Sequence, residues 1–290
     1  MSNRTQIWLF LGLVVVASIV FNTLIIGGGG LGNPATHKWV VYIMWAPGLA
    51  AILTTLLATR SLRGLGWCPW PLGQLVVGWA VPVIYAALTV AGAVLLGAGG
   101  FDISGWQEAA VARLGLDVGP WVGLLVLSAV GTLTSLTRAV GEEIGWRGFL
   151  VPALGREIGF WRLSLVSSLI WLAYHLPVLL FGGYAGEGTP VWYSLICFAA
   201  LIFIITPFFN AIRLRSNSFW PAALAHASHN LFIQGILVAA FVPGPQAKWL
   251  TGEFGALTSL VALGVVGIYF VVAGVPRTAH EQAPAGGETQ

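Results

Sequence analysis

The sequence predicts an all-α fold, a polytopic membrane bundle of about eight transmembrane helices. Of its 290 residues, 57% are hydrophobic and only 8% are charged, and the mean hydropathy is +0.87. A soluble domain usually carries about 25% charged residues. This composition excludes an ordinary soluble protein and indicates an integral, multi-pass membrane protein.

Eight apolar runs account for the predicted helices, and each can supply the roughly 20 residues that a spanning helix needs. The fourth run has no clear end, because it leads directly into a charged segment. The runs lie near Ile7–Ile26, Val40–Ala58, Leu72–Leu96, Trp121–Val140, Leu163–Phe181, Val191–Ile212, Trp220–Phe241 and Leu257–Ala273.

Basic residues predict the orientation, because cytoplasmic loops of membrane proteins are enriched in Lys and Arg. With a cytoplasmic N-terminus, ten of the 13 basic residues fall in inner segments, and only Lys38, Arg113 and Lys248 fall in outer ones. An even number of helices then places the C-terminus in the cytoplasm as well. The inner residues are Arg4, Arg60, Arg63, Arg138, Arg147, Arg156, Arg162, Arg213, Arg215 and Arg277.

The net charge of +3 is therefore interpreted as a topology signal. No compact run of Lys and Arg with interleaved aromatic residues indicates binding to nucleic acid. Several tryptophans instead lie at helix boundaries, as in the aromatic belt of a membrane protein. The expected partner along the helices is the lipid bilayer.

The polar stretches divide the chain into four parts. Residues 1–119 hold the first three helices and an outer loop, in which Trp106–Leu116 is expected to form a short surface helix. Residues 120–241 form a helical core, residues 242–275 the last helix, and residues 276–290 a disordered cytoplasmic tail, because its composition is small and polar.

The first polar motif is Glu142-Glu143, followed by Arg147. Helix residues four apart are neighbours, whereas adjacent residues are not. We therefore expect Glu143 to pair with Arg147, while Glu142 points about 100° away toward the interior of the bundle. The alternative is that both glutamates belong to an ordinary cytoplasmic helix end.

The second motif centres on His175, about 13 residues after Arg162. At roughly 1.5 Å per residue this is about 20 Å along the helix, which is inside the hydrocarbon layer. Pro177 removes a backbone donor and loosens the helix beside the histidine. The alternative is a histidine that only makes an interhelical hydrogen bond.

The third motif is His226-Ala-Ser-His229-Asn230. His226 and Asn230 are four residues apart and share a helix face, so both can address one oxygen atom. His229 lies on the other flank of that face and is expected to play a supporting role. A polar seam between helices is the alternative interpretation.

Together the three motifs provide a glutamate to activate water, a histidine to pass its proton, and a His–Asn pair to stabilise an oxyanion. Ionisable groups at membrane depth are functional candidates. We therefore expect these side chains to converge at one site, in the cytoplasmic half of the membrane.

The motifs resemble those of the CAAX protease and bacteriocin-processing family of intramembrane proteases, which are type II CAAX prenyl endopeptidase-like. That family has Glu-Glu-x-x-x-Arg, then Phe-x-x-x-His, then His-x-x-x-Asn on separate helices. The resemblance covers roughly residues 120–241. One difference is Trp171, which stands in place of the family's phenylalanine and keeps an aromatic side chain there.

The resemblance implies a catalytic role for Glu142, supported by Glu143 and Arg147. His175 would help to activate water, and His226 and Asn230 would bind the oxyanion. Two versions of the chemistry remain open. Zinc held by Glu142, His175 and His226 is one version, and a metal-free glutamate–histidine pair is the other.

The leading hypothesis is thus an intramembrane endopeptidase that cleaves a membrane-tethered, prenylated or bacteriocin-like peptide. In a prokaryote it would lie in the plasma membrane, with the active site toward the cytoplasmic leaflet. A second hypothesis is a non-catalytic immunity or adaptor protein with the same fold. A third is a proton-coupled transporter, which should show an inverted repeat, and the sequence shows none.

Overall fold

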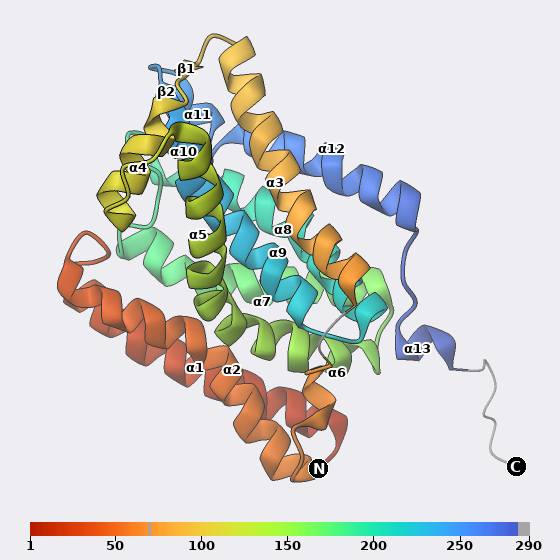
Figure 1. Cartoon of the computed structure of the whole chain (residues 1–290). Helices are drawn as coiled ribbons and strands as arrows, with labels where there is room; N and C mark the ends of the chain where they lie inside the picture. The colour runs from red at the N-terminus through yellow and green to blue at the C-terminus, as the bar shows by residue number, and fades with distance from the viewer. Residues whose placement is uncertain (69–70, 284–290) are drawn as a thin grey trace, which may run out of the picture.

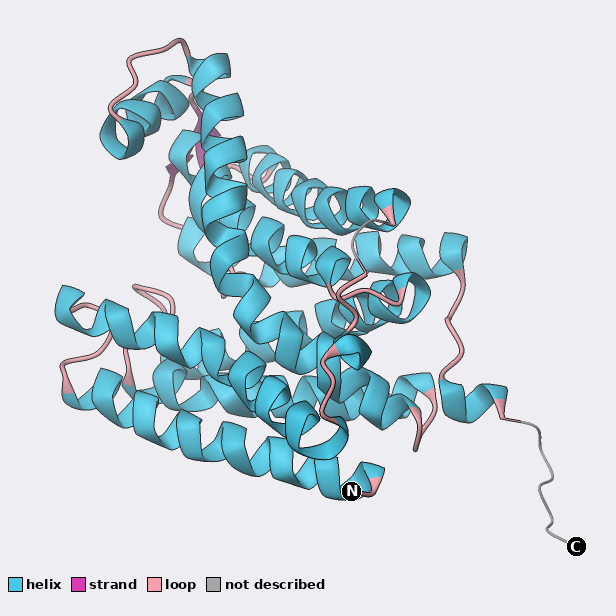
Figure 2. Ribbon diagram, turned by 60° about the horizontal axis from the view of Figure 1, so that its bottom comes forward, coloured by secondary structure: helices cyan, strands magenta, loops and turns pink. Residues whose placement is uncertain are grey.

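The computed structural model describes residues 1–68 and 71–283. It confirms an all-α membrane bundle, with eight helices in the described residues long and apolar enough to cross a bilayer. Figure 1 shows these helices packed around a central α9, and Figure 2 shows from another side that almost all of the chain is helical. The long helices are α1 (Asn3–Gly27), α2 (His37–Thr59), α3 (Leu72–Leu95), α5 (Pro120–Glu143), α7 (Phe160–Phe181), α8 (Val191–Ser216), α9 (Trp220–Leu231) and α12 (Ala256–Ala273).

Helix α9 lies at the centre because its side chains are small. It packs against α3, α5 and α8, and Figure 1 shows it enclosed by them. Small residues let helix backbones approach closely in a membrane. Four alanines of α9 are buried in these contacts: Ala222, Ala223, Ala225 and Ala227.

The fourth span does not end near Val140, where its apolar run ends. After α5 the chain continues as a π-helical segment, Ile144–Leu150, and then as α6, Val151–Gly155. A Cβ atom on Gly145 would lie 2.4 Å from Cβ of Pro47 in α2. Glycine thus permits this close crossing, which holds the charged motif inside the bundle.

The remaining elements are short. A short helix, α4, is present where the sequence predicts one. Strand β1 pairs with β2 in an antiparallel ribbon, with Gly99 opposite Pro243, which the sequence pattern did not predict. The short elements are α4 (Ser104–Leu114), α10 (Leu237–Ala240), α11 (Ala247–Leu250), β1 (Gly99–Phe101), β2 (Phe241–Pro243), 3-10 turns at Pro34–Thr36 and Arg63–Leu65, and a second π-helical segment at Phe232–Ile236.

The tail after Pro276, expected to be disordered, contains a short helix, α13 (Ala279–Gln282). A capping box stabilises its start, because the Thr278 and Glu281 side chains each bond the other's backbone N–H. The expectation of disorder is therefore wrong for this part of the tail. Residues 284–290 lie outside the described residues.

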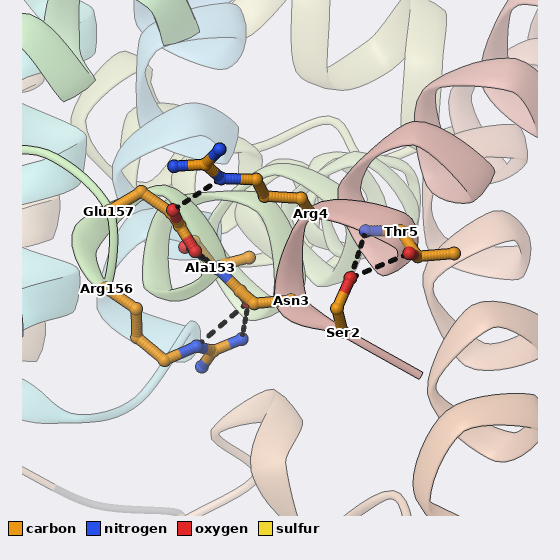
Figure 3. Close-up of polar contacts among 7 residues, drawn as sticks. All are labelled: Ser2, Asn3, Arg4, Thr5, Ala153, Arg156 and Glu157. Carbon is orange, nitrogen blue, oxygen red and sulfur yellow. Dashed lines mark hydrogen bonds and ion pairs between the residues drawn. The ribbon is translucent and has the colours of Figure 1, made fainter.

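The start of α1 is tied to the end of α6, as Figure 3 shows. Nδ2 of Asn3 donates to the carbonyl oxygen of Ala153 and to Oε1 of Glu157, at 2.9 and 2.8 Å. Arg156 donates to Oδ1 of Asn3, and Arg4 pairs with Glu157 at 3.0 Å. These contacts fix α1 against the segment that follows the charged motif.

Candidate active site

Glu142 lies at the end of α5 and is only 2% exposed. Its Oε2 accepts hydrogen bonds from the indole N–H groups of Trp146 at 3.2 Å and Trp171 at 3.0 Å. Among the described residues, nothing donates to its Oε1. The two indoles therefore orient the carboxylate and leave one oxygen available to a ligand.

Glu143 and Arg147 form the expected ion pair, with Nη1 of Arg147 2.8 Å from Oε1 of Glu143 and both side chains fully buried. The guanidinium carbon lies 4.6 Å from the ring centre of Trp171 and 5.0 Å from that of Phe209. Its Nε donates to Oδ1 of Asn210 at 3.3 Å. Aromatic faces and an ion pair together compensate the buried positive charge.

His226 is held by Glu143. Its Nδ1 lies 2.9 Å from Oε1 of Glu143, the same oxygen that Arg147 contacts. An ionised carboxylate can only accept, so Nδ1 of His226 carries the proton in this contact. Its Nε2 makes no hydrogen bond within the described part of the chain and is available to a ligand.

The tautomer of neutral His175 follows from its surroundings in the same way. Its Nδ1 lies 2.8 Å from the carbonyl oxygen of Trp171, and a carbonyl oxygen can only accept. Nδ1–H is therefore the donor. In the neutral ring the lone pair is on Nε2, which is the arrangement that a general base requires.

One cavity of about 470 Å³ connects these groups. It is large enough for several residues of a peptide, and its wall is polar where the motifs contribute. The amide of Asn230 has no hydrogen-bond partner among the described side chains and also lines the cavity. The residues from the sequence motifs that line it are Glu142, Trp171, His175, His226, His229 and Asn230.

His229 belongs to a second polar cluster in the cavity wall. Its Nδ1 lies 2.5 Å from the hydroxyl of Tyr85, and its Nε2 lies 3.3 Å from Oε1 of Glu253. Tyr184 donates to Oε2 of Glu253 at 2.6 Å, and Gln234 donates to Oε1. Sequence spacing did not find this cluster, because its members come from four separate segments.

Glu253 lies in the loop between α11 and α12, outside the spanning helices. Burial alone would raise the pKa of its carboxyl group, but hydrogen bonds and charge from His229, followed by those from Tyr184 and Gln234, outweigh burial and lower the pKa. Glu253 is therefore a carboxylate at neutral pH, and it fastens the loop to α9.

The zinc hypothesis requires three ligand atoms that converge on one point. Within residues 1–68 and 71–283, no group of three His, Cys, Asp or Glu side chains is placed to hold a metal ion. Among the described residues, Glu142, His175 and His226 line one cavity and keep Oε1 and both Nε2 atoms free, but the three side chains are not grouped closely enough to hold an ion. The three side chains do not form a ready-made zinc site.

Most of the helices around the cavity contribute to it from the same half of the bundle, whereas α5 contributes from its second half, within residues 131–142. The cavity is lined by the C-terminal end of α1, the N-terminal end of α2 and the second half of α7, and it reaches three loops through Leu31, Tyr184 and Glu253. The N-terminus and the basic segments around residues 60, 156 and 215 lie at the opposite end of these helices. The side of the membrane on which the cavity opens stays a prediction, because it depends on the orientation of the N-terminus.

These features define a class of protein: a multi-pass membrane bundle with carboxylate, imidazole and carboxamide groups around a buried cavity. Comparison with known proteins agrees. Residues 121–232 match the family model described as Type II CAAX prenyl endopeptidase Rce1-like. A relative in Methanococcus maripaludis, described as "CAAX prenyl protease 2", is 24% identical over 213 residues, which are 67% of this chain and 70% of the relative.

The family match confirms the resemblance that the three motifs indicate. Residues 121–232, which are less than half of the chain, thus match the Rce1-like domain of type II CAAX prenyl endopeptidases. All seven residues singled out in the motifs fall within the matched region. Tyr85 and Glu253, which complete the second polar cluster, fall outside it.

Proposed function

We propose that this protein is an intramembrane endopeptidase that hydrolyses a peptide bond in a membrane-associated substrate. One observation carries the proposal: a buried carboxylate with one free oxygen shares a cavity with two histidines whose Nε2 atoms are unoccupied. A carboxylate and an imidazole at one site can activate water. The family match supports a peptidase.

In the proposed reaction, Glu142 and Nε2 of His175 take a proton from a water molecule, whose oxygen attacks the carbonyl carbon of the substrate. The negative charge that develops on the carbonyl oxygen is stabilised by the amide of Asn230 and by His226 when its Nε2 carries a proton. The proton then passes to the amide nitrogen as the C–N bond breaks. The acyl product keeps the hydroxyl group of the added water, and the amine product keeps its proton.

Glu143 and Arg147 take no part in bond changes in this scheme. Glu143 orients His226 through Nδ1, and Arg147 balances the buried charge of Glu143. A hydrogen bond that one ring nitrogen donates to a carboxylate fixes the direction of the other ring nitrogen. These two residues are therefore positioning residues for the oxyanion site.

The substrate class is proposed from two sources. A site between transmembrane helices favours a peptide that is lipid-modified or membrane-tethered. The relative's name, "CAAX prenyl protease 2", makes a prenylated peptide ending in a CAAX sequence one substrate to test. A bacteriocin-like precursor peptide is the other.

The test is cleavage of both peptide types by the purified full chain in detergent. Glu142→Gln keeps the size of the side chain and removes the base, so we expect kcat to fall by at least about 10²-fold. Glu187→Gln, on an exposed loop, is the matched control and should retain activity. Full activity in a folded Glu142→Gln variant would refute the role of Glu142.

Metal dependence is tested in the same assay. Pre-incubation with a chelator followed by zinc distinguishes the two versions of the chemistry. The geometry leads us to expect unchanged cleavage after chelation. Loss of activity that zinc restores would instead establish a metal-dependent site that rearranges when the ion binds.

A further inference from the structure

Helix α1 carries one polar side chain on its buried face. The buried residues of this helix are Ile7, Phe10, Val14, Asn22 and Ile25. Asn22 is only 4% exposed and lies inside a membrane span. A buried amide in such a place is costly unless its polar atoms find partners.

The amide of Asn22 is oriented by the preceding turn of its own helix. Its Nδ2 donates to the carbonyl oxygen of Ser18 at 2.9 Å and to Oγ of Ser18 at 3.0 Å. The carbonyl oxygen of Ser18 can only accept, so it fixes which side of the amide carries the nitrogen. Oδ1 is left without a hydrogen-bond partner in the described structure.

Asn22 lines the cavity that contains Glu142 and His175. Among the described residues of the cavity wall, it alone has a fully buried side-chain oxygen or nitrogen with no partner. Of the two carboxylates in the cavity wall, Glu253 receives three hydrogen bonds, and Glu142 receives two on Oε2 and keeps Oε1 for the reacting water. Among the described residues, Oδ1 of Asn22 is therefore an uncharged acceptor in the cavity wall with no partner in the protein, and the amide of Asn230 on the α9 side is another.

A peptide entering this cavity brings backbone N–H groups that lose their contact with water. Each such group must find an acceptor, because an unsatisfied polar group in a water-poor site is costly. A carboxamide oxygen is well suited to accept from a neutral N–H. It carries no charge that the apolar surroundings would have to solvate.

We propose that Oδ1 of Asn22 accepts a hydrogen bond from a backbone N–H of the bound substrate peptide. Helix α1, which lies outside the matched residues 121–232, would thereby form part of the substrate-binding site. The substrate then runs between α1 on one side and the His226–Asn230 face of α9 on the other. The inference rests on the proposed peptidase function.

The experiment combines Asn22→Leu with a set of substrate peptides, each methylated at one backbone nitrogen. Leucine keeps the approximate size of the side chain and removes the acceptor. With the unmodified peptide we expect KM to rise about five- to tenfold, as for the loss of one hydrogen bond, while kcat stays within about twofold. N-methylation at one position should raise KM of the wild type similarly, and should raise KM of Asn22→Leu no further.

Ser18→Ala is the matched second variant, because it removes one of the bonds that orient the amide and leaves Asn22 in place. We expect a smaller rise in KM than for Asn22→Leu. If Asn22 only packs, every N-methylated peptide should show the same additional loss in both proteins. That additivity, or an unchanged KM in Asn22→Leu, would overturn the inference and leave the peptidase proposal intact.

Direct binding of the same peptides to wild type and Asn22→Leu separates the two proposals further. Wild type that binds a peptide without cleaving it would refute the peptidase proposal. The contact between Asn22 and the peptide would then still be tested by the ratio of the affinities of wild type and Asn22→Leu for the same peptide. Equal affinities for the two proteins would refute the contact itself.

Discussion

At the scale of single residues, Glu143 has more contacts than its spacing to Arg147 predicts. One of its oxygens accepts from both Arg147 and His226, and Arg147 is in turn bonded to Asn210 and covered by two aromatic rings. Glu142 and Glu143 are therefore neighbours in sequence with separate surroundings. The first faces the cavity, and the second holds the α9 histidine.

Replacing Arg147 with methionine tests this arrangement. The change would leave the buried carboxylate of Glu143 without its counter-charge, so we expect a loss of about 3–5 kcal/mol in stability. The measurement is thermal or denaturant unfolding of the purified protein in detergent. Arg4→Met, which breaks the exposed pair with Glu157, is the control and should change stability little. Equal effects of both variants would contradict the role assigned to Arg147.

Helical spacing was sufficient to predict the Glu143–Arg147 pair, because residues four apart contact each other within one helix. It also placed His226 and Asn230 on a shared face. Spacing could not predict Asn22, Tyr85 or Glu253 as parts of the cavity wall. Those contacts depend on how separate helices and loops pack, which local periodicity does not encode.

At the scale of elements, the crossing of α2 with the π-helical segment depends on glycine. Gly145→Ala would place a methyl group within 2.4 Å of Pro47, so we expect about 1–3 kcal/mol of destabilisation, typical of overpacking. Unfolding in detergent measures the effect. Gly12→Ala in α1, where nothing lies within 4 Å, is the matched control and should not destabilise the protein. A stable Gly145→Ala variant would show that α2 can move away.

The α11–α12 loop is fastened to the bundle by Glu253, and this contact predicts a dependence on pH. The pKa of Glu253 is lower in the folded protein, so its contribution to stability is fully present above the ordinary carboxyl pKa of about 4.3. That contribution is lost as the pH falls through the lowered value. Glu253→Gln should therefore destabilise the protein at neutral pH and flatten the loss of stability on acidification. Parallel acid unfolding curves for the two proteins would contradict this.

Hydropathy predicted all eight spans of the described chain, because each span must be apolar over about 20 residues. It did not predict how the fourth span ends. The apolar run stops near Val140, but Arg147 is buried by an ion pair and aromatic rings, so the helix continues to Gly155. The β1–β2 ribbon was missed because its two strands are three residues long and far apart in the chain.

At the scale of the whole molecule, the position of the cavity and the distribution of charge give a joint prediction. Arg138 lines the cavity and Arg147 is buried, so neither is a loop charge. The same holds for Arg213, which is buried, and for Arg113, which lines the cavity, so seven basic residues remain at the N-terminal end of the bundle, against two at the end reached by the cavity. From the positive-inside rule we therefore still predict a cytoplasmic N-terminus.

We therefore expect the cavity to open toward the non-cytoplasmic side of the membrane, which would favour an exported or surface-tethered peptide as substrate. Thiol labelling tests this, because Cys68 is exposed and Cys197 is buried, and Cys68 lies at the basic end. In intact cells, a membrane-impermeant maleimide should leave Cys68 unlabelled. It should label a Cys68→Ser, Glu187→Cys variant, whose new thiol lies in the loop beside Tyr184. The reverse pattern would invert the orientation, place the cavity mouth in the cytoplasm, and make a cytoplasmic prenylated peptide the better substrate.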